Sequence, residues 1–134
     1  MGVSRFGAWL DHMGAHFRVW APSAARLDLI LDGMHQPLPM TPAGDGTFVV
    51  DLPGPSHGRR YQYRIDGRGP FPDPASRSQP DGAHGASAID DPGAFAWRAA
   101  PPELARRDLV IYELHTGTFT PEGTFDGANS ATPS

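Results

Sequence analysis

Short runs of alternating apolar and polar residues, separated by Asp-Gly pairs, dominate the first half of the chain. Because side chains along a strand point alternately to opposite faces, such runs indicate strands with one buried and one exposed face. In the stretch "AHFRVWA", Phe17 and Val19 share one face, whereas Arg18 and Trp20 share the other. Three further stripes of this kind lie at residues 26–32, 48–52 and 60–65. The alternation predicts a set of half-buried β-strands.

The Asp-Gly pairs predict how these strands are connected. In the first ninety residues they begin at Asp32, Asp45, Asp66 and Asp81. Both residue types adopt positive φ at low cost, which tight reversals between antiparallel strands require. Short strands at this spacing over about a hundred residues are typical of a sandwich of immunoglobulin-like size. The sequence therefore predicts an all-β fold.

Composition limits the classes of partner. At 134 residues, the chain has room for one domain and the beginning of a second. The 11 basic residues are all arginines scattered among 15 acidic residues, so no nucleic-acid partner is expected. The opening stretch "MGVSRFGAWLDHMG" lacks the apolar run of a signal peptide, which predicts a cytoplasmic protein without a membrane partner. The absence of cysteine excludes disulfides and thiolate metal sites.

The second half of the chain changes in character. Residues 69–92 are rich in proline and are predicted to form a long extended loop. Residues 101–107, "PPELARR", are compatible with a single helical turn that has proline at its start. The stretch "DLVIYELH", residues 108–115, carries apolar residues on both faces, as expected of a strand that is covered on both sides.

Glu113 and His115 would project to one face of that strand. One hypothesis makes them an acid/base pair or part of a sugar subsite. The other, which we favour, is an ion pair or hydrogen-bonded pair that orients the strand. His12 and His16 are expected in a turn, and no cysteine, third histidine or carboxylate completes a ligand set with them. No metal site is predicted.

Trp20, Tyr61 and Tyr63 are candidates for carbohydrate binding, because the apolar face of a pyranose can lie on an aromatic ring. Large aromatic residues of a small sandwich more often belong to its core or to a domain interface. Trp20 is the strongest of the three candidates, because it shares the polar face of its strand with Arg18.

Several stretches together resemble one family. They are "FRVWAP", "YQYRIDG", "FPDPASRSQPDGAHGAS", "IDDPGAFAW" and "LVIYELHTGTFTPEGTF". Their order and spacing resemble maltooligosyltrehalose trehalohydrolase, in the α-amylase superfamily (glycoside hydrolase family 13). By themselves, "FRVWAP" and "VIYELH" indicate only the broader group of branching and debranching enzymes. The "PDPASRSQPDGAHG" loop joined to "HTGTFTPEGTF" is much more specific, and the resemblance covers nearly all of residues 6–126.

The resemblance implies a division of the chain. Residues 1–97 would form an immunoglobulin-like (E-set) β-sandwich related to glycogen-binding modules, and residues 98–108 a linker. Residues 109–126 would begin a (β/α)₈ barrel, with its first strand at 109–116 isolated from the remaining strands. The tail, residues 127–134, is polar and aperiodic where the family continues into an amphipathic helix, which suggests a truncation or a frame change.

The resemblance also implies roles for particular residues. Tyr112, Glu113 and His115 would belong to the first barrel strand. The proline-rich loop is expected at an interface with the barrel through Asp73, Arg77, Gln79 and His84. The catalytic carboxylates of the family lie on later barrel strands, so no catalytic residue, cofactor or metal is assigned here.

Three functional hypotheses follow. The leading one is an N-terminal part of a trehalohydrolase-like glycoside hydrolase, inactive by itself, which meets an α-glucan or maltooligosyltrehalose through the parent enzyme. The second is an independent α-glucan-binding module. The third is a structural sandwich that packs on a catalytic barrel domain.

Overall fold

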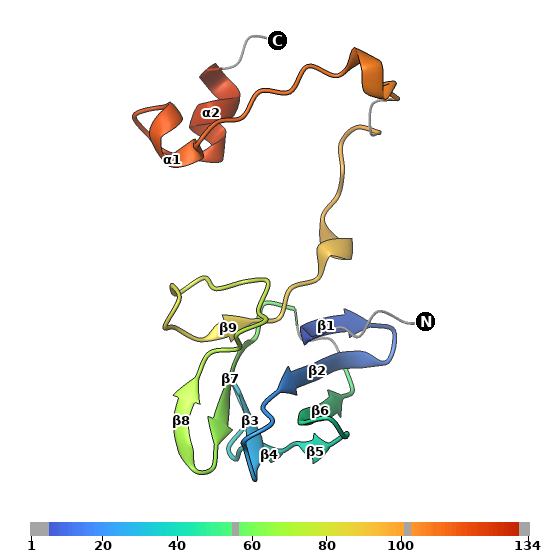
Figure 1. The fold of residues 1–134 in the computed structure, drawn as a ribbon, viewed down its shortest axis with the longest axis vertical. Helices are drawn as coiled ribbons and strands as arrows, with labels where there is room; N and C mark the ends of the chain where they lie inside the picture. Colours follow the sequence, from blue (N-terminus) through green and yellow to red (C-terminus); the bar gives the residue numbers. More distant parts are fainter. Residues whose placement is uncertain (1–5, 55–56, 101–102, 132–134) are drawn as a thin grey trace. The chain divides into compact units, whose positions relative to one another are not determined.

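The computed structural model describes residues 6–54, 57–100 and 103–131. The chain divides into two compact units, residues 1–96 and 97–134. All nine strands of the described part belong to the first unit, together with a 3₁₀ turn, η1 (Pro92–Ala94). The second unit contains a 3₁₀ turn, η2 (Arg106–Asp108), and the helices α1 (Thr116–Phe119) and α2 (Phe125–Ala131). Figure 1 labels the strands and the two helices along the chain.

One sheet of the first unit has four strands in the order β1-β2-β6-β5. The strands are β1 (Gly7–Asp11), β2 (Gly14–Trp20), β5 (Thr41–Pro42) and β6 (Thr47–Leu52). All neighbours are antiparallel. The strand β2 lies between β1 and β6, where Phe17 faces Val50 in register. The alternating stretch at residues 15–21 thus forms the middle of this sheet, as predicted.

The second sheet has the order β4-β3-β7-β8, and β9 also pairs with β7. Its strands are β3 (Leu27–Leu31), β4 (Leu38–Pro39), β7 (Arg60–Ile65), β8 (Arg68–Phe71) and β9 (Ser87–Ala88). The strand β9 pairs with β7 at Arg60 and Tyr61, whereas β8 pairs with it further along, from Tyr63. The proline-rich segment therefore leaves the sheet after β8 and returns to the same strand at β9.

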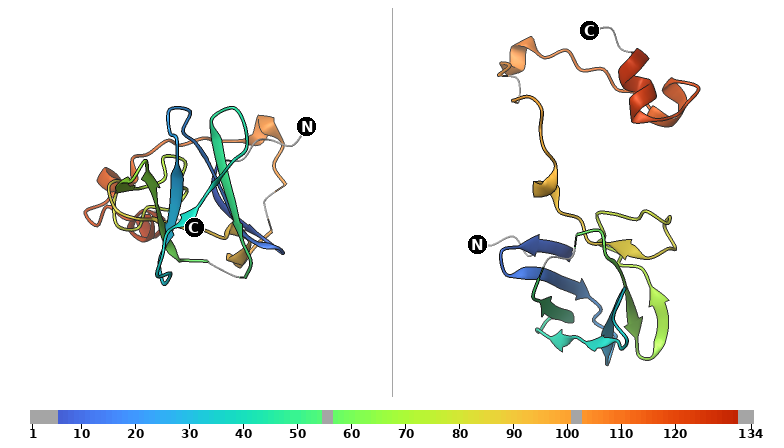
Figure 2. Two further views of the ribbon diagram at one scale, coloured as in Figure 1. Left: turned by 90° about the horizontal axis from the view of Figure 1, so that it is seen from below. Right: turned by 180° about the vertical axis from the view of Figure 1, so that it is seen from behind.

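The apolar faces of the two sheets meet in one core. Figure 2 shows the layer of β2 and β6 facing the layer of β3 and β7. Phe17 of the first sheet meets Tyr61 of the second edge to face, with ring centroids 5.1 Å apart. The members of the core on the principal strands are Phe17, Val19, Leu27, Leu29, Leu31, Phe48, Tyr61 and Tyr63. The predicted all-β sandwich is confirmed.

Two of the predicted Asp-Gly turns show why this pair recurs. Asp45 has φ of 52° and Asp66 has φ of 48°, and the glycine that follows each of them also has a positive φ. The side chain of Asp66 has a second function, because its Oδ1 accepts hydrogen bonds from the backbone N–H groups of Ala25 and Arg26, at 3.0 and 2.8 Å. That turn is therefore hydrogen-bonded to the segment directly before β3.

The strand expected at residues 109–116 is not formed. Residues 109–115 have no assigned strand, and α1 begins at Thr116. Val110 is 97% and Ile111 is 85% exposed. A strand needs a neighbour for its backbone hydrogen bonds, and the described residues offer this segment none. Of the helical turn expected at 101–107, residues 101–102 lie outside the described part, and a 3₁₀ turn begins only at Arg106.

Residues 125–131 form the helix α2, although the sequence from residue 127 is polar and aperiodic. The Oγ1 atom of Thr124, directly before the helix, accepts a hydrogen bond from the N–H of Gly127 at 3.1 Å. Asp126 in the first turn is favourably placed relative to the helix dipole. Capping, rather than an amphipathic pattern, accounts for this short helix.

We predict that two aliphatic truncations will have opposite consequences. Leu29→Ala removes a fully buried side chain and should lower the free energy of unfolding by about 3 kcal/mol. Ile111→Ala, the matched control, alters an exposed side chain and should change it by less than about 0.5 kcal/mol. Urea unfolding followed by circular dichroism measures both, and equal losses would contradict the described burial.

Candidate functional site

Trp20, at the end of β2, is 60% exposed. Its indole Nε1 donates a hydrogen bond to the backbone carbonyl of Asp45 at 3.0 Å. Asp45 belongs to the turn that leads into β6, so the indole is fixed against a neighbouring turn. An exposed aromatic ring held in one orientation loses little conformational entropy when a partner binds.

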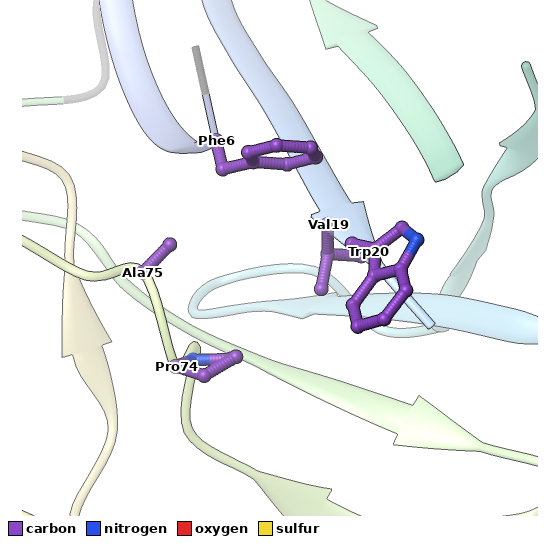
Figure 3. Close-up of a pocket in the computed structure, with 5 residues that line it drawn as sticks. All are labelled: Phe6, Val19, Trp20, Pro74 and Ala75. Atoms are coloured by element: carbon purple, nitrogen blue, oxygen red, sulfur yellow. The ribbon is translucent and has the colours of Figure 1, made fainter. Parts of the chain in front are cut away.

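A groove of about 490 Å³ lies beside this indole (Figure 3). Phe6, Val19, Trp20, Pro74 and Ala75 line it. Figure 3 shows the rings of Phe6 and Trp20 bordering the groove, with Pro74 and Ala75 across from them. These residues come from the beginning of β1 and the end of β2, which lie at the same end of this antiparallel pair, and from the loop after β8. The groove is almost entirely apolar.

Two contacts hold the loop after β8 against the beginning of β1. Gly7 has φ of 92°, and a Cβ atom at this position would lie 2.6 Å from the carbonyl oxygen of Ala75. Only glycine therefore permits this approach. The guanidinium of Arg77 donates hydrogen bonds to the carbonyls of Ala8 and Phe6, at 3.1 and 3.4 Å. These contacts fix the spacing between the walls of the groove.

The carboxylate of Asp73 anchors the same loop in the core. Its Oδ2 atom accepts hydrogen bonds from the hydroxyls of Tyr61 and Tyr63, at 2.8 and 3.3 Å. Its Oδ1 atom accepts one from the N–H of Ala75 at 2.8 Å, and its own N–H donates to Ser87 Oγ at 2.9 Å. One buried residue thus joins β7 and the loop through its carboxylate, and β9 through its backbone N–H.

This network corrects three of the predicted site residues. Tyr61 and Tyr63 are each 1% exposed, so neither ring is available to lie against a sugar. Their alternation on β7 directs them inward, where their hydroxyls need the acceptor that Asp73 provides. Asp73 is itself 2% exposed and is an internal anchor instead of an interface residue. Trp20 alone of the three aromatic candidates is accessible.

The two hydroxyls remain protonated. Burial, and after it the charge of Asp73, raises the pKa of Tyr61 and Tyr63 well above the ordinary value of 10. Both tyrosines therefore stay neutral donors throughout the accessible pH range. The network is a structural element and not a source of acid or base for catalysis.

The other predicted interface residues lie nearer the surface. His84 is exposed, and Arg77 is exposed although it binds the β1 carbonyls. Gln79 is half-buried, and its Oε1 atom is buried without a hydrogen-bond partner among the described residues. An interface role for Arg77, Gln79 and His84 stays a prediction.

His16 is the centre of a charged cluster on the outer face of the first sheet. It lies on β2, not in the expected turn, and its ring stacks on Trp9 of β1 with centroids 5.3 Å apart. Its Nδ1 atom is 2.8 Å from an oxygen of Asp51 on β6, and its Nε2 atom is 2.9 Å from an oxygen of Asp11 on β1. Both nitrogens face carboxylates, an arrangement that favours the doubly protonated, positively charged ring.

The cluster links three neighbouring strands through charge. Asp11 and, more weakly, Asp51 raise the pKa of His16, against the opposing effect of its partial burial. The histidine in turn lowers the pKa of Asp11 below its ordinary value. Because folding favours the charged forms of His16 and Asp11, the cluster stabilises the sheet most strongly at mildly acidic pH.

The described residues show no arrangement typical of a catalytic or metal centre. No group of three or more histidine or carboxylate side chains among them is arranged to hold a metal ion. In the second unit, Glu113 and His115 form no ion pair. The ring of His115 lies instead 3.3 Å from the hydroxyl of Thr118 at the beginning of α1. The pair expected from strand spacing is absent because the strand is absent.

Residues 5–81 match carbohydrate-binding module 48, the isoamylase N-terminal domain. The chain belongs to the carbohydrate-binding module 48 family. The match covers the sandwich from the first residues of β1 into the loop that carries Asp73, Pro74 and Ala75. The residues that line the groove, and Asp73, therefore lie within the matched region.

Several proteins related to the chain over most of its length share one name. This chain is 43% identical over 125 residues to the malto-oligosyltrehalose trehalohydrolase of Saccharolobus solfataricus. The match covers 91% of this chain and 22% of the relative. The chain is 43% identical over 122 residues to the protein of that name from Arthrobacter ramosus, covering 87% and 21%. The chain thus spans about a fifth of the length of these relatives.

Solved structures agree with the fold. An alpha-amylase structure from Salmonella typhimurium is 37% identical with a TM-score of 0.85, covering 96% of this chain and 22% of that one. Apo pullulanase from Paenibacillus barengoltzii is 27% identical with a TM-score of 0.66, covering 87% and 20%. None of the helices described here is sufficiently long and apolar to span a membrane.

The sequence identified Trp20 but not its partners in the groove. Phe6 lies just outside the strand that begins at Gly7, and Pro74 and Ala75 lie in a loop far along the chain. Neither alternation nor spacing brings such residues together. The nearest sequence signal was the glycine at position 7 directly after Phe6.

We predict that Asp73→Ala will lower the free energy of unfolding by about 3 kcal/mol or more, because it leaves two buried hydroxyls and a backbone N–H without an acceptor. Asp81→Ala, which removes an exposed ion pair with Arg60, is the control and should cost less than about 1 kcal/mol. Thermal and urea unfolding measure both. Similar losses for the two variants would contradict the role of Asp73 as an anchor.

We also predict a pH-dependent effect of His16→Gln. The folded-state pKa of His16 is raised, so its stabilising contribution is complete below its unfolded pKa of about 6.5 and is lost as pH rises through the folded value. The variant should therefore be destabilised more at pH 5.5 than at pH 8.5. His35→Gln is the matched control, because His35 is exposed and contacts no carboxylate in the described part. A pH-independent difference would refute the ion-pair cluster.

Proposed function

We propose that this chain supplies the non-catalytic N-terminal module of a glycoside hydrolase that releases trehalose from maltooligosyltrehalose. The observation that carries the proposal is the 43% identity to malto-oligosyltrehalose trehalohydrolases across the sandwich and the segment after it. The activity belongs to the parent enzyme, which we place in the cytoplasm and which meets the α-glucan substrate.

The second unit supports this assignment through its uncovered apolar segment. Leu109, Val110, Ile111 and Tyr112 are all exposed. Burying such side chains stabilises a protein by about 1.5 to 3 kcal/mol each, so a segment of this composition is suited to a covered strand. We propose that residues 109–116, including Tyr112, Glu113 and His115, become the first strand of a (β/α)₈ barrel when the other strands are present. The proposed boundaries remain 1–97 for the sandwich, 98–108 for the linker and 109–126 for the beginning of the barrel.

The chain by itself is proposed to be inactive. Retaining glycoside hydrolysis uses two carboxyl groups about 5 Å apart, one as nucleophile and one as acid. In the sandwich, Asp11 and Asp51 converge, but His16 lies between them and pairs with both. A carboxylate held in an ion pair is neither a free nucleophile nor a proton donor.

We predict that a chimera will be active where this chain is not. The chimera joins the 134-residue chain, in place of the matching fifth, to the remainder of the trehalohydrolase of Deinococcus radiodurans, to which it is 40% identical. The chimera should release trehalose from maltooligosyltrehalose, because the chain supplies the module and the relative supplies the catalytic residues. Trehalose is measured by chromatography with standards.

The isolated chain and the relative without its matching region are the controls. Release of trehalose by the isolated chain would overturn the proposed non-catalytic role. A folded chimera that releases none would overturn the assignment to this enzyme.

A further inference from the structure

We infer that the groove lined by Phe6, Val19, Trp20, Pro74 and Ala75 receives an apolar side chain from the catalytic domain of the parent enzyme, and is not a glucan subsite. The inference rests on the proposed function and specifies where the module and the catalytic domain meet. Trp20, which the sequence predicted to bind a sugar and which is accessible, would then contact a protein side chain instead.

The chemistry of the lining favours a protein side chain. Sugars are bound by an aromatic surface together with polar groups that pair with the hydroxyls, since an unpaired hydroxyl loses its hydrogen bonds to water. Phe6, Val19, Pro74 and Ala75 have no polar side-chain atom. The indole Nε1 of Trp20 already donates to Asp45. An aliphatic or aromatic side chain needs none of these missing partners.

The groove is held open by contacts outside it. Asp73 fixes Ala75 from the core, Arg77 binds the carbonyl of Phe6, and Asp45 fixes the ring of Trp20. Each wall is therefore tied to a different part of the sandwich. A preorganised apolar surface loses little conformational entropy on binding, as expected of a permanent contact surface for a neighbouring domain.

The share of its relatives that this chain covers indicates what fills the groove. The match to the Saccharolobus relative covers 91% of this chain but 22% of the relative, so a much larger body accompanies this module there. Pro74 and Ala75 belong to the stretch "PDPASRSQPDGAHG", which resembles the trehalohydrolases more specifically than the strands do. Arg77, exposed and bound to Phe6, adds a positive charge beside the groove. The partner surface should therefore present an acidic group next to its apolar side chain.

Thiol protection in the chimera tests this inference. The chain has no cysteine, so Ala75→Cys places a single thiol in the groove and Met13→Cys places one in an exposed turn as the control. Each is compared between the isolated chain and the chimera, and maleimide labelling is followed by peptide mass spectrometry. We expect the groove thiol to react about ten-fold more slowly in the chimera, while the control changes by less than about two-fold. Equal labelling of the groove thiol in both proteins would overturn the inference.

A second measurement remains informative if the cysteine variant fails to fold. Electrophoresis of the isolated chain through glycogen gels compares the wild type with Trp20→Ala. Migration of the wild type that glycogen does not retard supports a groove that binds a protein side chain. Retardation of the wild type that is lost in the variant identifies a glucan site and overturns the inference. Trehalose release by the wild-type chimera reports separately on the proposed function. An active chimera with a fully reactive groove thiol would refute the inference alone.

Discussion

The sandwich depends on one buried carboxylate. Asp73 receives the hydroxyls of Tyr61 and Tyr63 and the N–H of Ala75, while its own N–H reaches Ser87. A charge without these donors would be too costly to bury, and the tyrosines without the charge would leave two hydroxyls unpaired. Each partner therefore requires the others. The proline-rich loop is consequently part of the folded core and not an appendage to it.

This constraint links the interior of the module to its surface. The loop that enters the core at Asp73 emerges as Pro74 and Ala75 against β1, where glycine at position 7 lets the two backbones approach. The same contacts that complete the core thus set the width of the apolar groove. A binding surface built on backbone positions fixed in this way has a defined shape without a partner. That property suits a supporting module better than one that adapts to varied ligands.

Strand alternation made the sandwich predictable. Phe17, Leu29 and Tyr61 lie in the core because each is on the apolar face of a regular run. The same regularity could have warned against assigning Tyr61 to sugar binding, yet its buried hydroxyl partner was 12 positions away in a loop. The strand predicted at 109–116 is not formed in this structure, because a residue pattern can indicate that a segment needs a neighbouring strand but cannot supply one. Positions that depend on distant loops, such as Ala75, had no local signal.

The shortest strands of the sandwich have a protective consequence. One edge of each sheet ends in a two-residue strand, β4 or β5, and each of these finishes in a proline, Pro39 or Pro42. A proline has no N–H with which to recruit another strand, and a strand of two residues gives an incoming chain almost no template. These edges therefore resist self-association. The exposed apolar segment at residues 109–112 has no such protection, and a cell that makes this chain would need to keep that segment covered.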